Sequence, residues 1–198
     1  MTRKINFPKY GILYLTMLAI ASALTLVSAA DSPTSRAFPG VTIKNFGKVN
    51  EHYYRGSQPT AGQFAQLKHL GIKTVVDLRE DTERGAADAA QKAGLQYFRI
   101  AMRASTPATK EQTAYFLALV NDPTNWPVYV HCKGGRHRTG AMTAVYRITH
   151  DDWTADQAYQ EMKDYDFNNG LFGGPEAQKR FVYSFYQQFH ASSNGGQK

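Results

Sequence analysis

The chain of 198 residues carries 23 Lys and Arg against 16 Asp and Glu, a formal net charge of +7, and 42% of its residues are apolar. This length suits one domain, and the balanced composition excludes a disordered or low-complexity protein. The single cysteine excludes an intramolecular disulfide framework and any zinc or iron–sulfur site built from several cysteines.

Residues 1–30 are predicted to be a targeting segment that does not belong to the fold. Basic residues without any acid lie among residues 1–9, residues 10–27 are uncharged, and small residues follow, with Ser28 and Ala30 in the cleavage positions. This pattern is typical of a secretory signal peptide. The alternative is an uncleaved membrane anchor, because a helix over the apolar stretch would rise about 27 Å. With the basic end inside, both interpretations export the working domain, to the periplasm or the cell exterior.

The remainder is predicted to form one domain over 45–190, preceded by a linker over 31–44 and followed by a flexible tail over 191–198. Apolar periodicity, with glycines as stops, predicts the elements of this domain. Strands are expected over 41–43, 52–55, 72–78, 95–100 and 127–131, and helices over 64–70, 85–93, 109–120, 139–150, 154–165 and 175–190.

The alternation of strands with helices predicts an α/β fold with a central sheet of about four mainly parallel strands flanked by helices. The nearly continuous apolar run over 72–78 is typical of a buried parallel strand. Sites in such sheets lie beyond the carboxyl ends of the strands. Three loops are therefore the candidate positions for a site: 79–85, 101–108 and 132–138.

The third loop lies in the sequence HCKGGRHRTG, residues 131–140, between a predicted strand and a predicted helix. Its two glycines let several backbone N–H groups point inward, and such a nest at a helix N-terminus binds a tetrahedral dianion. Arg138 can add a forked contact to two phosphate oxygens. Cys132, at the bottom of this positively charged loop, is expected to be largely thiolate. Together these residue types favour nucleophilic phosphoryl transfer.

The segment from Cys132 to Thr139 resembles the Cys-x5-Arg-Thr/Ser loop of the protein-tyrosine and dual-specificity phosphatase superfamily. It is especially similar to the atypical bacterial, plant and fungal branch, whose loops are rich in Lys, Arg and His. The segments YRGSQP, 54–59, and GIKTVVDLR, 71–79, are also similar to that family's entry strand and first core strand. The resemblance thus covers most of residues 45–165 and implies a cysteine-phosphatase-like fold.

The resemblance also implies roles for individual residues. Cys132 would be the nucleophile and form a phosphocysteine, Arg138 would bind phosphate and stabilise the transition state, and Thr139 would hydrogen-bond the departing thiolate. His131 would orient the loop without acting as the base. The remaining loop residues would bind substrate through their backbone amides, with the basic side chains facing incoming anions: Lys133, Gly134, Gly135, Arg136 and His137.

The family's general acid, an Asp about thirty residues before the cysteine, has no counterpart here, because residues 100–107 contain no carboxylate. Three carboxylates are candidates for protonating the leaving oxygen: Asp81, Glu83 and Glu111. Asp81 has the best position in a loop, whereas Glu111 suits a charge in the first turn of a helix. The missing acid also suits a leaving group that needs little protonation, such as that of a phosphoanhydride.

The leading function is a cysteine-dependent phosphatase that hydrolyses phosphomonoesters, with phosphotyrosine in a protein or a phosphorylated inositol as substrate. A non-catalytic phosphate-binding module remains open because of the missing acid. A rhodanese-like sulfurtransferase is a weaker alternative, because its loop does not require an Arg six residues after the cysteine followed by Thr.

Further expectations concern partners and cofactors. The histidines show no His-x3-His pairing, so neither a metal site nor a cofactor is expected. No basic run exceeds a pair such as Lys179-Arg180, so a nucleic-acid partner is not expected. The protein is expected to be a monomer that meets a membrane only through residues 1–30, if these are not cleaved. Arg79 is expected to pair with Asp77 and to hold the end of its strand.

Overall fold

The structure is a computed structural model that describes residues 38–81, 85–167 and 174–195. The predicted targeting segment, residues 1–30, therefore lies outside the described residues. Within the described ranges, no helix combines the length and the apolar character needed to cross a membrane.

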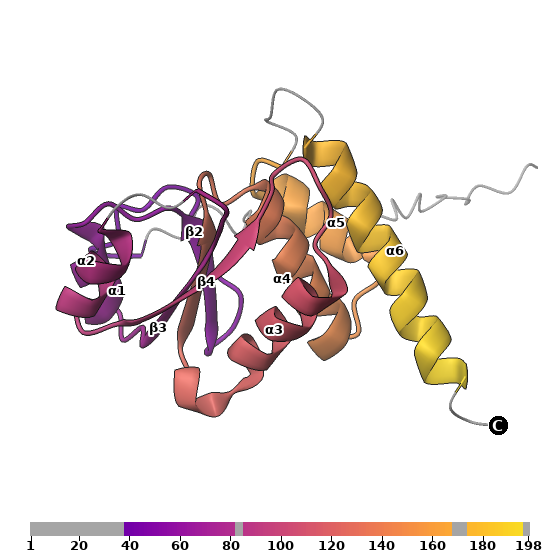
Figure 1. Ribbon diagram of the computed structural model, residues 1–198, viewed down its shortest axis with the longest axis horizontal. Coiled ribbons are helices and arrows are strands. Elements are labelled where there is room, and N and C mark those ends of the chain that lie inside the picture. The colour runs from indigo at the N-terminus through magenta and orange to yellow at the C-terminus, as the bar shows by residue number, and fades with distance from the viewer. Residues whose placement is uncertain (1–37, 82–84, 168–173, 196–198) are drawn as a thin grey trace, which may run out of the picture. The chain divides into compact units, whose positions relative to one another are not determined.

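Five strands form one sheet in the order β1-β2-β5-β3-β4 (Figure 1). The strands are β1 (Gly47–Lys48), β2 (Tyr53–Ser57), β3 (Thr74–Arg79), β4 (Gln96–Met102) and β5 (Val128–Cys132). Strands β2, β5, β3 and β4 pair in parallel, and the short edge strand β1 pairs antiparallel with β2. The predicted α/β fold with a mainly parallel sheet is confirmed. The segment predicted as a strand over 41–43 forms no strand, and the two-residue β1 was not predicted.

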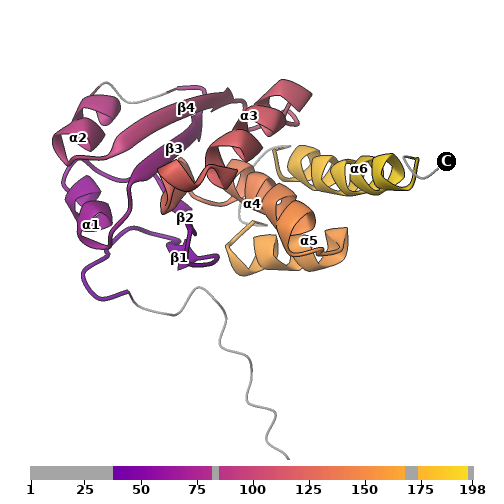
Figure 2. The same ribbon diagram turned by 90° about the horizontal axis from the view of Figure 1, so that it is seen from below.

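Helices cover both faces of the sheet, as Figures 1 and 2 show. The helices are α1 (Gln63–His69), α2 (Ala86–Lys92), α3 (Lys110–Asn121), α4 (His137–His150), α5 (Ala155–Asp164) and α6 (Gly174–Gly195), with a short 3-10 helix at Pro123–Asn125. Apolar side chains of α1 and α2 pack on one face, and those of α3 and α4 pack on the other. Helices α5 and α6 then pack against α4.

Alternation along the central strands explains why both faces are covered. Val75 and Tyr129 pack with α1 and α2, whereas their neighbours Val76, Leu78 and Val130 pack with α3 and α4. All five side chains have 0% exposure. Successive residues of a strand point to opposite faces, so a continuous apolar run requires a layer of helices on each side.

Two helices begin where the sequence predicts them. Thr109 and Thr154 are the N-cap residues of α3 and α5, and in both cases a glutamine three residues later completes a capping box. Each hydroxyl accepts a hydrogen bond from a backbone N–H of the first turn, which has no partner within the helix.

The ends of the fold differ from the predicted boundaries. Phe38, Val41 and Ile43 pack against the cluster beside α1 and α2, so the fold extends into the segment predicted as a linker over 31–44. At the other end, α6 continues to Gly195 and so includes most of the predicted tail over 191–198.

Candidate active site

The 132–138 loop joins the carboxyl end of β5 directly to the first turn of α4. Cys132 is the last residue of β5 and is 3% exposed. Helix α4 begins at His137, two residues earlier than predicted, so Arg138 and Thr139 lie in its first turn and are buried. Cys132, Arg138 and Thr139 therefore lie at the N-terminal end of a 14-residue helix, where backbone N–H groups favour an anion.

Strand β2 packs against the underside of this loop. Ser57 is paired with Cys132, and the backbone N–H of Gln58 donates to Lys133 O at 3.2 Å. Gly135 has φ +69°, and a Cβ on it would lie 2.5 Å from Gly56 O and 2.7 Å from Ser57 N. Only glycine combines this backbone conformation with such a close approach.

Arg138 and Thr139 contribute buried polar groups beside Cys132 in the chain. The Nη1 group of Arg138 donates to Met102 O at 2.9 Å, which connects the carboxyl end of β4 to α4. Within the described part of the chain, Arg138 Nε and Thr139 Oγ1 are buried without a hydrogen-bond partner. Buried polar groups are costly when unpaired, so these two atoms are suited to a polar ligand.

His131 lies buried beneath the loop, 1% exposed. Its Nδ1 is 3.4 Å from Cys132 O and 3.8 Å from Asp77 Oδ1. Burial lowers the pKa of His131 to about 4, although the Asp77 carboxylate acts in the opposite direction. At neutral pH the imidazole is therefore neutral.

Because His131 is buried, we predict that the protein loses stability in mild acid. The unfolded chain binds a proton to this residue near its ordinary pKa of 6.5, whereas the folded chain binds it only near 4. Stability therefore falls as the pH drops through this window, and this residue alone should remove about 2 kcal/mol between pH 7 and pH 5. In His131→Asn, urea unfolding at the two pH values should show that much less acid sensitivity. The same change at exposed His69 is the control, and equal acid sensitivity in wild type and His131→Asn would contradict the prediction.

The side chain of His137 contacts a backbone carbonyl of the segment after α5. Its Nε2 lies 2.9 Å from Phe167 O, and burial lowers its pKa below the ordinary value. The ring therefore contacts the segment after α5 through its Nε2 atom. The side chain of Lys133 is exposed and that of Arg136 is half-buried. Gly134 and Gly135 contribute only backbone groups to the loop.

Of the three candidate general acids, Asp81 and Glu111 lie within the described residues. Asp81 is exposed just after β3, and Glu83 lies outside the described residues. Glu111 sits in the first turn of α3, where hydrogen bonds from its own backbone N–H and from Thr109 lower its pKa below the ordinary value. The interpretation of Glu111 as a first-turn helix charge is confirmed, and its ionised state makes it a poor proton donor.

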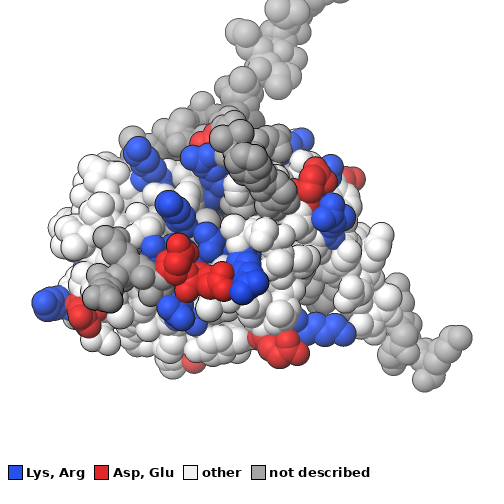
Figure 3. All heavy atoms as spheres, turned by 45° about the horizontal axis from the view of Figure 1, so that its top comes forward, with Lys and Arg blue, Asp and Glu red and all other residues white. Residues whose placement is uncertain are grey.

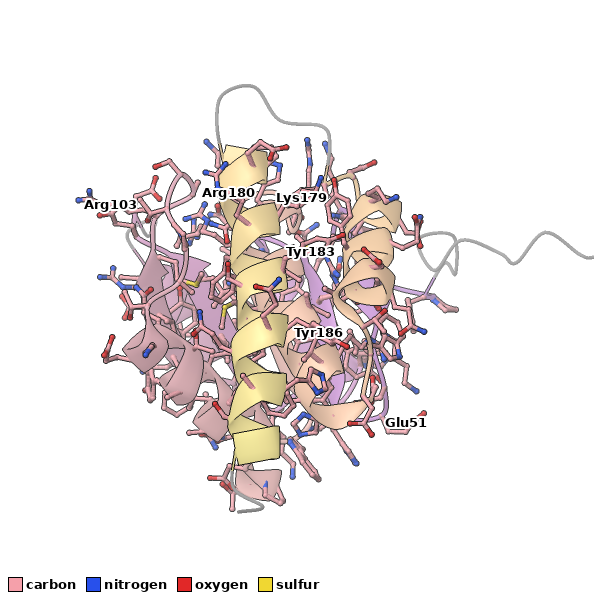
Figure 4. The ribbon with its side chains drawn as sticks, turned by 90° about the vertical axis from the view of Figure 1, so that its right-hand side faces the viewer. Glu51, Arg103, Lys179, Arg180, Tyr183 and Tyr186 are labelled. Atoms are coloured by element: carbon pink, nitrogen blue, oxygen red, sulfur yellow. The ribbon has the colours of Figure 1, made fainter. Side chains whose placement is uncertain are left out.

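The loop after β4 is held in place although it contains no carboxylate. Gln178 of α6 donates to Thr106 O at 2.8 Å and to Ala104 O at 3.3 Å. Arg103, on the same loop, pairs with Glu80 at 3.0 Å on the surface. Figure 4 shows Arg103 and Arg180 at the end of the molecule where α6 begins. The Arg103–Glu80 pair and the Gln178 hydrogen bonds thus connect the carboxylate-free loop to the end of β3 and to α6.

The predicted pair between Asp77 and Arg79 is confirmed. Arg79 donates from Nε and Nη2 to the Asp77 carboxylate at 2.9 and 2.7 Å, and Tyr97 adds a hydroxyl at 2.6 Å. Burial by itself would raise the pKa of Asp77, but the hydrogen bonds from Arg79 and Tyr97 and the nearby His131 lower it below the ordinary value. The pair closes the carboxyl end of β3 next to His131.

Three residues that contact or support the 132–138 loop were missed by the sequence reasoning: Asn45, Arg55 and Glu161. Asn45 and Arg55 donate to loop carbonyls, and Glu161 lies beside Arg55. The sequence signal for this contact was Arg55, a charged residue in a strand whose other residues are typical of the protein interior. Its partner could not be identified from sequence spacing, because Gly135 lies 80 residues away.

An apolar groove is separate from this loop. A groove of about 840 Å³ between α3 and α6 has a mainly apolar lining that includes Leu117, Phe181 and Phe185, and no residue of the 132–138 loop lines it. On the face shown in Figure 3, basic and acidic side chains are interspersed. Among the described residues, no group of three or more His, Cys, Asp or Glu side chains could hold a metal ion.

A cysteine at the end of a parallel strand, followed by a glycine-containing loop and an arginine in the first helical turn, is the arrangement of a cysteine-dependent phosphatase. A family model described as DSP-PTPase phosphatase fused to NAD+ kinase matches residues 42–180. The chain therefore belongs to the DSP-PTPase phosphatase family, and the resemblance stated from the sequence is confirmed.

Known proteins agree with this assignment. Dual specificity protein phosphatase TpbA of Pseudomonas aeruginosa is 29% identical over 125 residues, which cover 63% of this chain and 56% of TpbA. Inositol diphosphatase DSP3 of Arabidopsis thaliana is 29% identical over 132 residues, covering 64% of this chain and 63% of that protein. The crystal structure of TpbA matches with a TM-score of 0.60 and 26% identity, covering 74% of this chain and 91% of that chain.

Proposed function

We propose that this phosphatase hydrolyses phosphomonoesters by attack of the Cys132 thiolate on phosphorus. The S–P bond forms as the P–O bond to the leaving group breaks, and water then cleaves the phosphocysteine to release phosphate and the thiolate. Arg138 and the amides of the 132–138 loop stabilise the charge on the transferring group, and Thr139 hydrogen-bonds the departing thiolate. The observation that carries this proposal is that Arg138 Nε and Thr139 Oγ1, buried beside Cys132 in the chain, have no partner among the described residues.

The substrate is proposed to be a phosphorylated inositol or phosphotyrosine in a protein. The name of DSP3 supports the first class and that of TpbA the second. The carboxylate-free loop after β4 favours a leaving group of low basicity, as in a phosphoanhydride. For more basic leaving groups, Asp81 is the proposed proton donor, because it lies in the loop after β3.

The proposal is tested by measuring phosphate release from a small aryl phosphate, phosphotyrosine and phosphoserine peptides, and inositol polyphosphates. We expect release from the aryl phosphate, and the preferred biological substrate identifies the class. A series of phosphate esters of decreasing leaving-group acidity, compared between wild type and Asp81→Asn, tests the proton donor. Inorganic phosphate binding without release from any substrate would replace this proposal with a non-catalytic phosphate-binding module.

The basic side chains of the 132–138 loop are predicted to select polyanions. Removing two charges with Lys133→Ala and Arg136→Ala together should lower kcat/KM for inositol polyphosphates about 30-fold, and for a small aryl phosphate about 3-fold or less. The reason is that only the larger substrate carries further phosphates within reach of these side chains. The control removes equal charge at exposed Lys73 and Lys92. Equal losses on both substrates in the loop variant would contradict the prediction.

Export is proposed from the pattern of residues 1–30, a basic start, an apolar stretch and small residues. N-terminal sequencing of the protein made by its own host should then find a start at Asp31. A start at the first residue in a membrane fraction would instead support the anchor.

A further inference from the structure

Two side chains from the N-terminal part of the chain hold carbonyl groups of the 132–138 loop. Asn45 Nδ2 lies 3.3 Å from Gly134 O and 3.2 Å from Gly135 O, and Arg55 Nη2 donates to Gly135 O at 3.1 Å. In a planar trans peptide, the C=O and N–H groups point in opposite directions. A donor on each carbonyl therefore directs the N–H groups of Gly135 and Arg136 away from Asn45 and Arg55.

Arg55 is held in a buried polar cluster. Its side chain is 0% exposed, its guanidinium lies 3.8 Å from the centre of the Tyr165 ring, and its Nη1 lies 3.8 Å from Glu161 Oε2. Arg147 donates to the other oxygen of Glu161 at 2.7 and 3.1 Å. Burying a guanidinium is costly, and an apolar residue would pack in its place without that cost. The hydrogen bond from Arg55 to the 132–138 loop is therefore a reason for a buried charge at this position.

Asn45 occupies a backbone conformation that few residues adopt. Its φ is +54°, and its side-chain amide also donates to Tyr165 O at 3.1 Å. Asparagine is one of the few residues other than glycine that tolerates the left-handed region. The strained position places one amide group between the 132–138 loop and the segment after α5.

We propose that Asn45 and Arg55 are positioning residues that hold the 132–138 loop with its amides directed at the phosphate. They act through the carbonyls of Gly134 and Gly135 and do not touch the substrate. This proposal rests on the proposed function of the loop, and it gives Asn45 and Arg55 a role in positioning that loop. Without them, the amides turn away, so the loop binds phosphate more weakly and stabilises the Cys132 thiolate less.

The sharpest test is Asn45→Gly, because glycine keeps the positive φ and removes only the side-chain donor. Cys132 is the only cysteine, so iodoacetamide alkylation reports on this thiol alone. We expect the rate of alkylation at neutral pH to fall about 10-fold and kcat to fall about 10-fold or more, with a smaller change in KM. Protection of Cys132 by inorganic phosphate should weaken about 10-fold, and the melting temperature should shift by about 5 °C or less.

The matched control is Asp152→Gly, the same kind of change at an exposed residue with φ +52° outside the site. It should leave alkylation, phosphate protection and kcat unchanged. Arg55→Lys, which keeps the charge and loses the forked geometry, should shift all three in the same direction as Asn45→Gly. A folded Asn45→Gly protein with the wild-type alkylation rate and wild-type phosphate protection would overturn the proposal. Alkylation and protection need no turnover, so they decide this proposal even if the wild type releases no phosphate from any substrate.

Discussion

Replacing Cys132 with serine is expected to reduce phosphate release by about 10⁴-fold or more, because a serine hydroxyl remains protonated at neutral pH and is a much weaker nucleophile than the proposed Cys132 thiolate. Binding of inorganic phosphate should persist, since Arg138 and the loop amides are unchanged. The two quantities are measured as phosphate release from an aryl phosphate and as phosphate affinity by calorimetry. Their separation is the signature of a nucleophile as opposed to a binding residue.

A chemical control accompanies the serine variant. Alkylation of the wild type with iodoacetamide modifies its single cysteine and should abolish release in parallel with labelling. Phosphate present during labelling should protect the activity. Wild-type release by the serine variant would mean that another group is the nucleophile, and the proposed phosphocysteine would then be wrong.

Replacing Gly135 with alanine is expected to cause the largest structural loss of any single change in the 132–138 loop. The new Cβ would lie 2.5 Å from Gly56 O, on the rigid backbone of β2, at a residue whose φ is +69°. Strain of this kind should lower the free energy of unfolding by about 3 kcal/mol or more. Phosphate release should fall by about 100-fold or more, because the loop must leave β2 to accommodate the methyl group. Denaturant unfolding and phosphate release measure the two effects.

Gly134→Ala is the matched control in the same loop. The nearest atom to its new Cβ is Arg136 Nε at 3.3 Å, which belongs to a flexible side chain that can move. The cost in unfolding free energy should therefore be about 1 kcal/mol or less. Similar losses in the two variants would show that the contact between Gly135 and β2 does not hold the loop.

Signals between neighbouring residues account for the features that the sequence predicted correctly. The apolar run of β3 and the threonines before α3 and α5 are short-range signals, and each was found at or within two residues of its predicted place. The spacing of Cys132 and Arg138 is equally local, because a strand, a tight loop and a helix follow one another without interruption. Such signals depend on turn-forming residues and on apolar periodicity, and both can be identified directly in the sequence.

Long-range contacts explain what was missed. The ring of His137 meets Phe167 O, and α6 reaches across to hold the carboxylate-free loop after β4 through Gln178. Polar side chains of this kind indicate only that a partner is needed, and the partner is determined by which segments become neighbours.

The sequence by itself determined the α/β architecture, the mainly parallel sheet and the Cys132–Arg138 loop, because periodicity and spacing are properties of neighbouring residues. Only the tertiary structure decided that Asn45 and Arg55 support this loop from 80 or more residues away. It also decided that His131 is buried and neutral at neutral pH. Burial and hydrogen-bond pairing arise when the strands are placed side by side, and the order β2-β5-β3 sets these contacts.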